Sequence, residues 1–79
     1  MTWNESDGAL HAELTFADFA EAFAFMTRVG LIAQEQQHHP DMSISWNVVT
    51  IAITSHDAGN VVTDKDRKLA AAIDAMGVA

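Results

Sequence analysis

Apolar and polar residues alternate near the start of the chain, in the segment "ALHAEL" (residues 9–14). A period of two residues is typical of a strand with one face buried and the other in solvent. The segment "SDG" (residues 6–8) precedes it and has the composition of a tight turn. We therefore predict a hairpin of two strands between Trp3 and Leu14.

A helical pattern follows and extends to about Gln36, before the proline at position 40. Thr15 is expected to cap its start, with Asp18 as the capping-box partner. Two apolar lines run along this helix: Phe16, Phe19, Phe23 and Met26 form the first, and Phe25, Val29 and Ile32 form the second. A helix with so wide an apolar surface usually has more than one neighbour. We expect one side to lie on the sheet and the other to meet a second helix or another subunit.

Alternation returns after Pro40, and it predicts two more strands at residues 42–46 and 49–56, joined by a turn at 47–48. In the second of these strands the apolar side chains at 49, 51 and 53 share one face. The other face carries Thr50, Ala52, Thr54 and His56. His56 is thus expected to end a strand on its polar face, away from the helices.

A last helix is predicted after the loop at residues 57–62. Thr63 is its expected N-cap, with Asp66 three positions on as the capping-box carboxylate. Leu69, Ile73 and Met76 would form the buried stripe, and Gly77 would end the helix.

The predicted order is β-β-α-β-β-α, in a single domain over residues 1–79. This order indicates an α+β fold, with a four-stranded antiparallel sheet and the helices packed on one face. So small an open sheet leaves edge strands, and strand pairing between subunits is therefore plausible.

Composition narrows the classes of partner. The chain has 79 residues, no cysteine and a formal net charge of −7, with only four Lys and Arg. Nucleic acid and anionic membranes reward basic side chains, so we expect neither as a direct partner. The first ten residues contain no basic segment followed by an apolar run, and we expect no signal peptide. The predicted protein is soluble, cytoplasmic and oligomeric.

Candidate chemistry centres on four histidines. His11 has the pattern of a surface residue on a strand, whereas His38 and His39 are adjacent and precede Pro40. With His56, this pair permits three interpretations: a solvated loop, a site for a divalent metal ion, or acid–base catalysis by imidazoles that titrate near neutral pH. Spacing alone does not choose among them.

The segment "HHPD", an alternating strand, and then "TSHDAGNVVTDKD" leading into a helix resemble the pterin-4a-carbinolamine dehydratase family, also called 4a-hydroxytetrahydrobiopterin dehydratases. The matching positions are His38, His39, Pro40, Ser55, His56 and Asp66. Upstream, the first strand and the long helix resemble those of the family at Trp3, Phe16, Asp18, Phe23 and Met26. The resemblance covers essentially the whole chain.

The sequence departs from the family pattern at three places. Family members commonly have a helix before the strand that begins near Trp3, and this helix is expected to be absent here. Gln34 stands where a Glu is common, and Met42 stands where an aromatic residue often follows the proline. None of these departures removes an imidazole.

The resemblance implies dehydration of a 4a-hydroxytetrahydropterin to the quinonoid dihydropterin and water, a step in tetrahydrobiopterin recycling. It implies a small-molecule pterin substrate, no metal or other cofactor, and a homodimer or homotetramer. Catalytic roles fall to His38, His39 and His56. His38 and His56 would be the acid–base pair, while His39 with Pro40 holds the pterin.

By the same resemblance, Ser55, Asp57 and Ala58 would line the substrate pocket. Asp66 is explained equally well by its capping box or by support of a histidine. Two alternative functions stay open. One is a non-catalytic dimerisation module, like relatives that act as transcriptional coactivators, with the second apolar line of the long helix as the interface. The other is a divalent-metal site at the three histidines.

Overall fold

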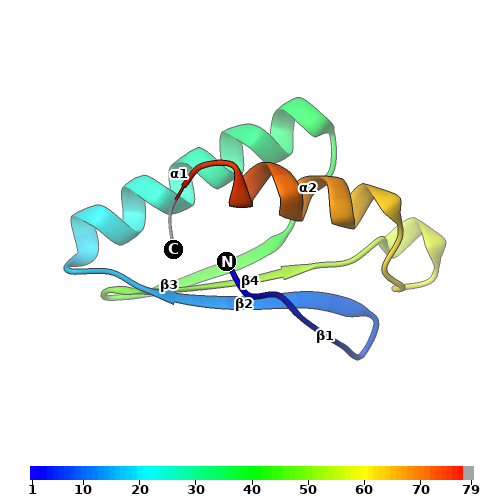
Figure 1. Cartoon of the computed structure of the whole chain (residues 1–79), viewed down its shortest axis with the longest axis horizontal. Coiled ribbons are helices and arrows are strands. Elements are labelled where there is room, and N and C mark those ends of the chain that lie inside the picture. Colours follow the sequence, from blue (N-terminus) through cyan, green and yellow to red (C-terminus); the bar gives the residue numbers. More distant parts are fainter. Residues whose placement is uncertain (78–79) are drawn as a thin grey trace.

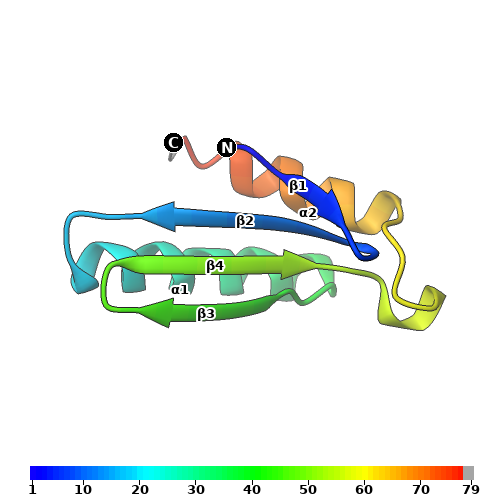
Figure 2. The same cartoon turned by 90° about the horizontal axis from the view of Figure 1, so that it is seen from below.

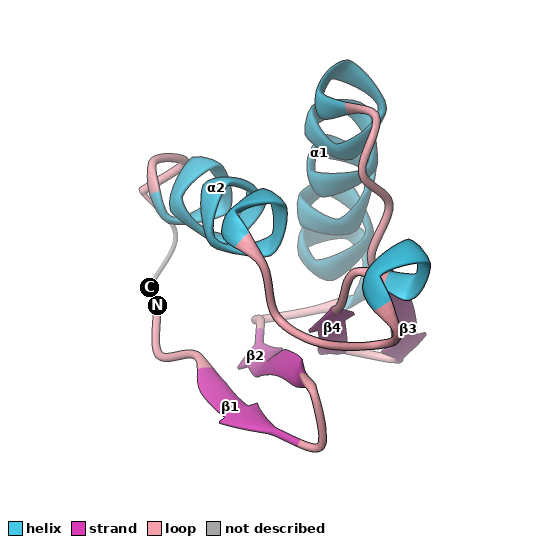
Figure 3. Cartoon of the chain, turned by 90° about the vertical axis from the view of Figure 1, so that its right-hand side faces the viewer, coloured by secondary structure: helices cyan, strands magenta, loops and turns pink. Residues whose placement is uncertain are grey.

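The structure, a computed structural model, describes residues 1–77 as a four-stranded sheet covered by two helices (Figure 1). Its elements are β1 (Asn4–Ser6), β2 (Ala9–Thr15), α1 (Phe19–Gln36), β3 (Asp41–Ser45), β4 (Val48–Ile53), a short 3₁₀ helix η1 (His56–Ala58), and α2 (Asp64–Asp74). The strands are antiparallel, in the order β1-β2-β4-β3. Both helices lie on one face of the sheet (Figures 2 and 3), and the predicted fold class is confirmed. Residues 78 and 79 of the predicted domain lie outside the described residues.

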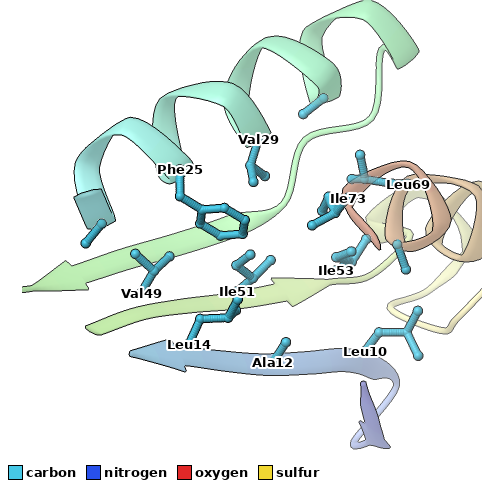
Figure 4. Close-up of a cluster of buried hydrophobic side chains, with 13 residues drawn as sticks. Leu10, Ala12, Leu14, Phe25, Val29, Val49, Ile51, Ile53, Leu69 and Ile73 are labelled. Atoms are coloured by element: carbon cyan, nitrogen blue, oxygen red, sulfur yellow. The ribbon is translucent and has the colours of Figure 1, made fainter. Parts of the chain in front are cut away.

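The core lies between the helices and the two central strands (Figure 4). Antiparallel pairing sets Leu10 opposite Ile53 and Ala12 opposite Ile51, so the apolar positions of β2 and β4 share one face. The buried cluster consists of Leu10, Ala12, Leu14, Ala22, Phe25, Val29, Ala33, Val49, Ile51, Ile53, Leu69, Ala70 and Ile73. The predicted parity of the second central strand is therefore correct.

The start of α1 differs from the prediction. Thr15 is the last residue of β2, where it pairs with Val48, and so it cannot cap the helix. Asp18 is the N-cap instead, and its carboxylate accepts a hydrogen bond from the backbone N–H of Glu21 at 2.9 Å. The residue predicted as the capping-box partner is thus the cap itself.

The two apolar lines of α1 differ in solvent exposure. Phe25 and Val29 are 3% and 0% exposed and pack on the sheet. Phe19 and Phe23, from the other line, are 47% and 53% exposed, and their rings stack with centroids 5.7 Å apart. The prediction of an interface through Phe25 and Val29 is therefore wrong, because core packing already buries both side chains.

The turn between β3 and β4 lies at residues 46–47, one position earlier than predicted. The backbone of Asn47 accepts a hydrogen bond from Phe16 N–H at 2.8 Å, and its side-chain amide donates to Phe16 O at 2.9 Å. These two bonds tie the turn to the segment after β2. Trp46, predicted as the last residue of a strand, consequently lies in the turn, with a φ of 50°, and is 66% exposed.

Helix α2 ends earlier than predicted, at Asp74. Ala75 is its C-cap, and Met76 lies beyond the helix, where it packs against the edge of the core. Asp74 accepts a hydrogen bond from the indole N–H of Trp3 at 3.1 Å, which ties the N-terminal segment to the end of α2. Neither helix in the described part of the chain is long and apolar enough to cross a membrane.

Candidate active site

Three connections meet at the end of the molecule that faces the viewer in Figure 3: the segment between α1 and β3, the segment that follows β4, and the start of α2. They surround a hollow of about 280 Å³, which we call the histidine hollow. Its lining consists of Gln37, His38, His39, Thr54, His56, Asp57 and Lys65. Three of the four imidazoles of the chain therefore line one hollow, although they come from two separate segments.

The backbone of His38 is positioned by the way α1 ends. Gln37 adopts the left-handed conformation, with a φ of 55°, and its N–H donates to the carbonyl of Gln34. The N–H of His38 then donates to Ala33 O at 3.1 Å, which completes a Schellman motif. Such a motif usually has glycine at the left-handed position, so the sequence carried no strong signal for it.

The imidazole of His38 is held by a buried carboxylate. Its Nε2 lies 2.6 Å from Oδ1 of Asp66, and the side chains of His38 and Asp66 are 13% and 0% exposed. The other carboxylate oxygen, Oδ2, accepts hydrogen bonds from the backbone N–H of Thr63 and from Ser55 Oγ, both at 2.7 Å. Asp66 thus has both roles considered for it, because one oxygen completes the capping box of α2 and the other holds His38.

These contacts set the charge of Asp66. Burial raises the pKa of its carboxyl, but the hydrogen bonds from His38, the Thr63 N–H and Ser55 outweigh burial and hold that pKa below its ordinary value. Asp66 is consequently ionised at neutral pH and accepts a hydrogen bond from Nε2–H of His38. The described residues give Nδ1 of His38 no hydrogen-bond partner, and this nitrogen stays available to a ligand.

His39 and His56 are held in the same manner by neutral side chains. Nε2 of His39 lies 2.8 Å from Oε1 of Gln34, and Nδ1 of His56 lies 2.8 Å from Oδ1 of Asn60. An amide oxygen only accepts, so each of these ring nitrogens donates. In each of the three rings, one nitrogen is therefore hydrogen-bonded to a protein side chain. The second nitrogen has no hydrogen-bond partner among the described residues.

His56 does not end a strand, contrary to the prediction. Strand β4 ends at Ile53, and His56 begins η1. The reason is Ser55, whose side chain is buried. Its backbone forms an antiparallel bridge to Val61, so the chain turns back immediately after β4. The following side chain, that of His56, is directed outward and is exposed.

The remaining residues predicted for the site do not all line the histidine hollow. Asp57 lines the histidine hollow and also a neighbouring one of about 290 Å³, which we call the acidic hollow. The acidic hollow is lined by Ser55, Asp57, Ala58, Thr63, Asp64 and Lys65. Pro40 lines neither of the two, and His11 lies apart on β2, next to the carbonyl of Ser6.

Sequence reasoning missed Gln37, Thr54 and Lys65 in the lining of the histidine hollow. Thr54 was predicted on the polar face of the strand at residues 49–56, whereas it follows the end of β4 at Ile53. Lys65 follows the predicted cap of α2 by two positions and gave no signal of its own. Among residues 1–77, no group of three or more His, Asp or Glu side chains is arranged to hold a metal ion.

The β1–β2 turn packs against the loop that contains η1. Gly8 has a φ of 76°, and a Cβ on it would lie 2.1 Å from the backbone oxygen of Asn60, the residue that holds His56. Thr54 Oγ1 donates to the carbonyl of Gly8 at 2.6 Å. Only glycine allows both the backbone conformation and this close approach.

We therefore expect Gly8→Ala to destabilise the fold by about 1–3 kcal/mol, the range for a strained backbone position. The measurement is the midpoint of urea unfolding. Gly30→Ala is the matched control, because Gly30 lies inside α1 and an added Cβ meets nothing within 4 Å. That control should stabilise the protein by about 0.5–1 kcal/mol through helix propensity. A Gly8→Ala midpoint at or above that of wild type would contradict the close contact.

Residues 1–76 match the family described as Pterin 4 alpha carbinolamine dehydratase. The chain is 49% identical over 74 residues to a protein of Synechococcus sp. (strain WH7803) named "Putative pterin-4-alpha-carbinolamine dehydratase", with 94% of this chain and 78% of that one covered. A protein of the same name from Rhizorhabdus wittichii is 47% identical over 76 residues, with 94% and 77% covered.

Two solved structures are similar to this fold. The crystal structure of a transcriptional coactivator/pterin dehydratase from Brucella melitensis superimposes with a TM-score of 0.85 at 33% identity, covering 92% of this chain and 79% of that one. A pterin dehydratase-like protein identified as a RuBisCO assembly factor in the alpha-carboxysome gives a TM-score of 0.72 at 21% identity, with 94% and 84% covered. At that identity the second similarity concerns the fold alone.

Proposed function

Since the chain belongs to the pterin-4-alpha-carbinolamine dehydratase family, we propose that it dehydrates 4a-hydroxytetrahydropterins to quinonoid dihydropterins by histidine acid–base catalysis. The observation that supports this proposal is the position of His38, His39 and His56 around one hollow. The relevant pathway would be tetrahydrobiopterin recycling. A cytoplasmic location stays a prediction of the sequence.

The reaction needs two proton transfers. A base removes a proton from a ring nitrogen, the nitrogen lone pair forms the new C=N bond, and the C–O bond at carbon 4a breaks. An acid protonates the departing hydroxyl, so that it leaves as water. Histidine side chains are suited to both steps near neutral pH, because a free imidazole has a pKa of about 6.5.

In the proposed division of roles, His38 and His56 form the acid–base pair. Each has a ring nitrogen that no described protein group occupies. Asp66 is a positioning residue, which orients the ring of His38 and fixes its tautomer from behind. His39 and Asp57 would contact the pterin from the histidine hollow, and Ser55 and Ala58 would do so from the adjoining acidic hollow. Pro40 lines neither hollow and has no contact role in this proposal.

The direct test is turnover by the purified protein. A 4a-hydroxytetrahydropterin is generated in the assay, and its spontaneous dehydration is followed by absorbance with and without protein. We expect the protein to accelerate the step in proportion to its concentration. Equal rates in both reactions would refute the proposal.

A second candidate role, self-association, is favoured by the outer face of α1. Phe19, Phe23 and Leu31 are 47%, 53% and 67% exposed, which is unusual for apolar side chains on one helix. We propose that this face packs against further copies of the chain in a homodimer or homotetramer. It replaces the predicted interface through Phe25 and Val29.

The double variant Phe19→Ser, Phe23→Ser is expected to reduce the mass in solution to that of the 8.6 kDa monomer. Light scattering measures the mass, and circular dichroism checks that the variant stays folded. Val61→Ser is the control, because Val61 is also exposed, at 46%, but lies between η1 and α2. A wild-type protein that is already monomeric, or an unchanged mass in the double variant, would contradict this interface.

A further inference from the structure

A third hollow adjoins the histidine hollow and differs from it in charge. It has a volume of about 390 Å³, and we call it the lysine hollow. Its lining consists of Gln36, Gln37, His38, Lys65 and Lys68. Its lining includes two lysines and no acidic residue, in a protein whose formal net charge is −7. This concentration of positive charge runs against the overall composition.

The lysine hollow is continuous with the proposed reaction site. The two hollows share Gln37, His38 and Lys65. A flat ring bound among the histidines therefore has a place beside it into which a substituent can extend. The acidic hollow, which Lys65 also lines, has Asp57 and Asp64 in its lining and is less suited to an anion.

The two ammonium groups are free to turn towards a ligand. Nζ of Lys65 lies 3.8 Å from Asp57 Oδ2, and the two side chains are 67% and 76% exposed. An ion pair so exposed is weak and easily exchanged. Lys68 forms no ion pair with any residue in the range 1–77.

Arg67 lies between these two lysines in the sequence but serves a different surface. Its guanidinium donates to Glu5 at 3.0 Å, and it lines a separate hollow with Trp3 and Leu10. Arg67 therefore offers a control: its substitution changes the net charge of α2 without changing the lining of the lysine hollow.

We propose that Lys65 and Lys68 form an anion subsite for a phosphate on the side chain of the pterin, at carbon 6 of the ring. This inference rests on the proposed function, and it deepens that function by naming the substrate class. A phosphate dianion matches two separate ammonium groups better than a single negative charge does. The preferred substrates would then be phosphorylated pterins rather than pterins with neutral side chains.

The test compares neopterin with neopterin 3′-phosphate, two fluorescent pterins that differ only in the phosphate. We expect the phosphate to tighten binding about tenfold at low salt, because each exposed lysine–phosphate ion pair should contribute about threefold. This advantage should shrink as ionic strength rises from about 0.1 M to about 1 M, because the Debye length falls from about 10 Å to about 3 Å.

Variants assign the effect to the subsite. Lys65→Gln and Lys68→Gln should each reduce the phosphate advantage about threefold, and the double variant should abolish it. Arg67→Gln removes the same charge from the same helix and should leave the advantage intact. In turnover assays the effect of Lys68→Gln should be confined to KM, with kcat unchanged, because Lys68 lines the lysine hollow but not the histidine hollow.

The outcomes separate this inference from the proposed function. If both pterins bind equally, or if Arg67→Gln lowers the advantage as much as Lys68→Gln does, the anion subsite is refuted while the dehydratase proposal stands. If neither pterin binds and the protein has no turnover, both proposals are refuted. Tighter binding of the phosphate that is lost only with the two lysines supports the subsite.

Discussion

Replacement of His38 or His56 by alanine is expected to lower kcat for carbinolamine dehydration by about 10²–10⁴-fold each, the usual contribution of a positioned acid or base. Each substitution removes a ring nitrogen that no described protein group occupies and that lies at the histidine hollow. The double variant should approach the rate of the spontaneous reaction. Single-turnover absorbance kinetics at neutral pH measure the effect directly.

Two controls separate catalysis from folding. His11→Ala removes an imidazole outside the hollow and should leave kcat within about twofold, because surface substitutions rarely disturb a fold. His39→Ala should act mainly on KM if His39 holds the pterin. Circular dichroism must show that all variants are folded. The acid–base assignment fails if the His38→Ala, His56→Ala double variant is as fast as wild type.

Asp66→Asn is expected to lower the free energy of unfolding by about 1–3 kcal/mol, the cost of leaving buried polar groups without proper partners. Oδ1 and Oδ2 of Asp66 together accept hydrogen bonds from His38, Ser55 and the Thr63 N–H. An amide offers one oxygen instead of two, and its NH₂ group would face a donor. The substitution should also lower kcat, because the ring of His38 loses the acceptor that fixes its tautomer.

The pH dependence of this stability difference has a definite sign. The pKa of Asp66 is lowered in the folded protein, so the carboxylate stabilises the fold at every pH above its unfolded pKa of about 3.9. That stabilisation is lost as the pH falls through the lowered folded value. Urea unfolding should therefore show a full difference between wild type and Asp66→Asn at neutral pH, and a difference that shrinks progressively as the pH falls below the unfolded pKa of about 3.9.

Asp64→Asn is the matched control for Asp66, with the same change of charge two positions earlier in α2. Asp64 is exposed, so its substitution should change stability by no more than about 0.5 kcal/mol at any pH. Equal stability losses in the two variants would mean that the buried network contributes nothing beyond the general charge of the helix. A loss in Asp66→Asn that is independent of pH would contradict an ionised carboxylate.

Local patterns in the sequence were sufficient for the order of elements and for much of the core. The two-residue period of β4 assigned Ile51 and Ile53 to the buried face, because successive side chains of a strand must point to opposite sides. The same logic failed at the element ends. Thr15 and Trp46 were misplaced because pairing with Val48 and the two hydrogen bonds between Phe16 and Asn47 decide where those elements stop.

Periodicity also could not choose between the two faces of α1. Both lines of its side chains are apolar, and the choice depended on which line fits against β3, β4 and α2 in three dimensions. The structure buries Val29 and exposes Phe23. An interface inferred from the sequence was consequently assigned to residues that belong to the core.

The sequence by itself determined which chemical groups the protein possesses and the order of its strands and helices, since these depend on residue identity and on short periods. Only the tertiary structure decided which groups meet. His38 and Asp66 are 28 positions apart and become hydrogen-bonded because the end of α1 and the start of α2 are brought together above the sheet. Contacts at that separation depend on packing of the whole core, and no local pattern contains them.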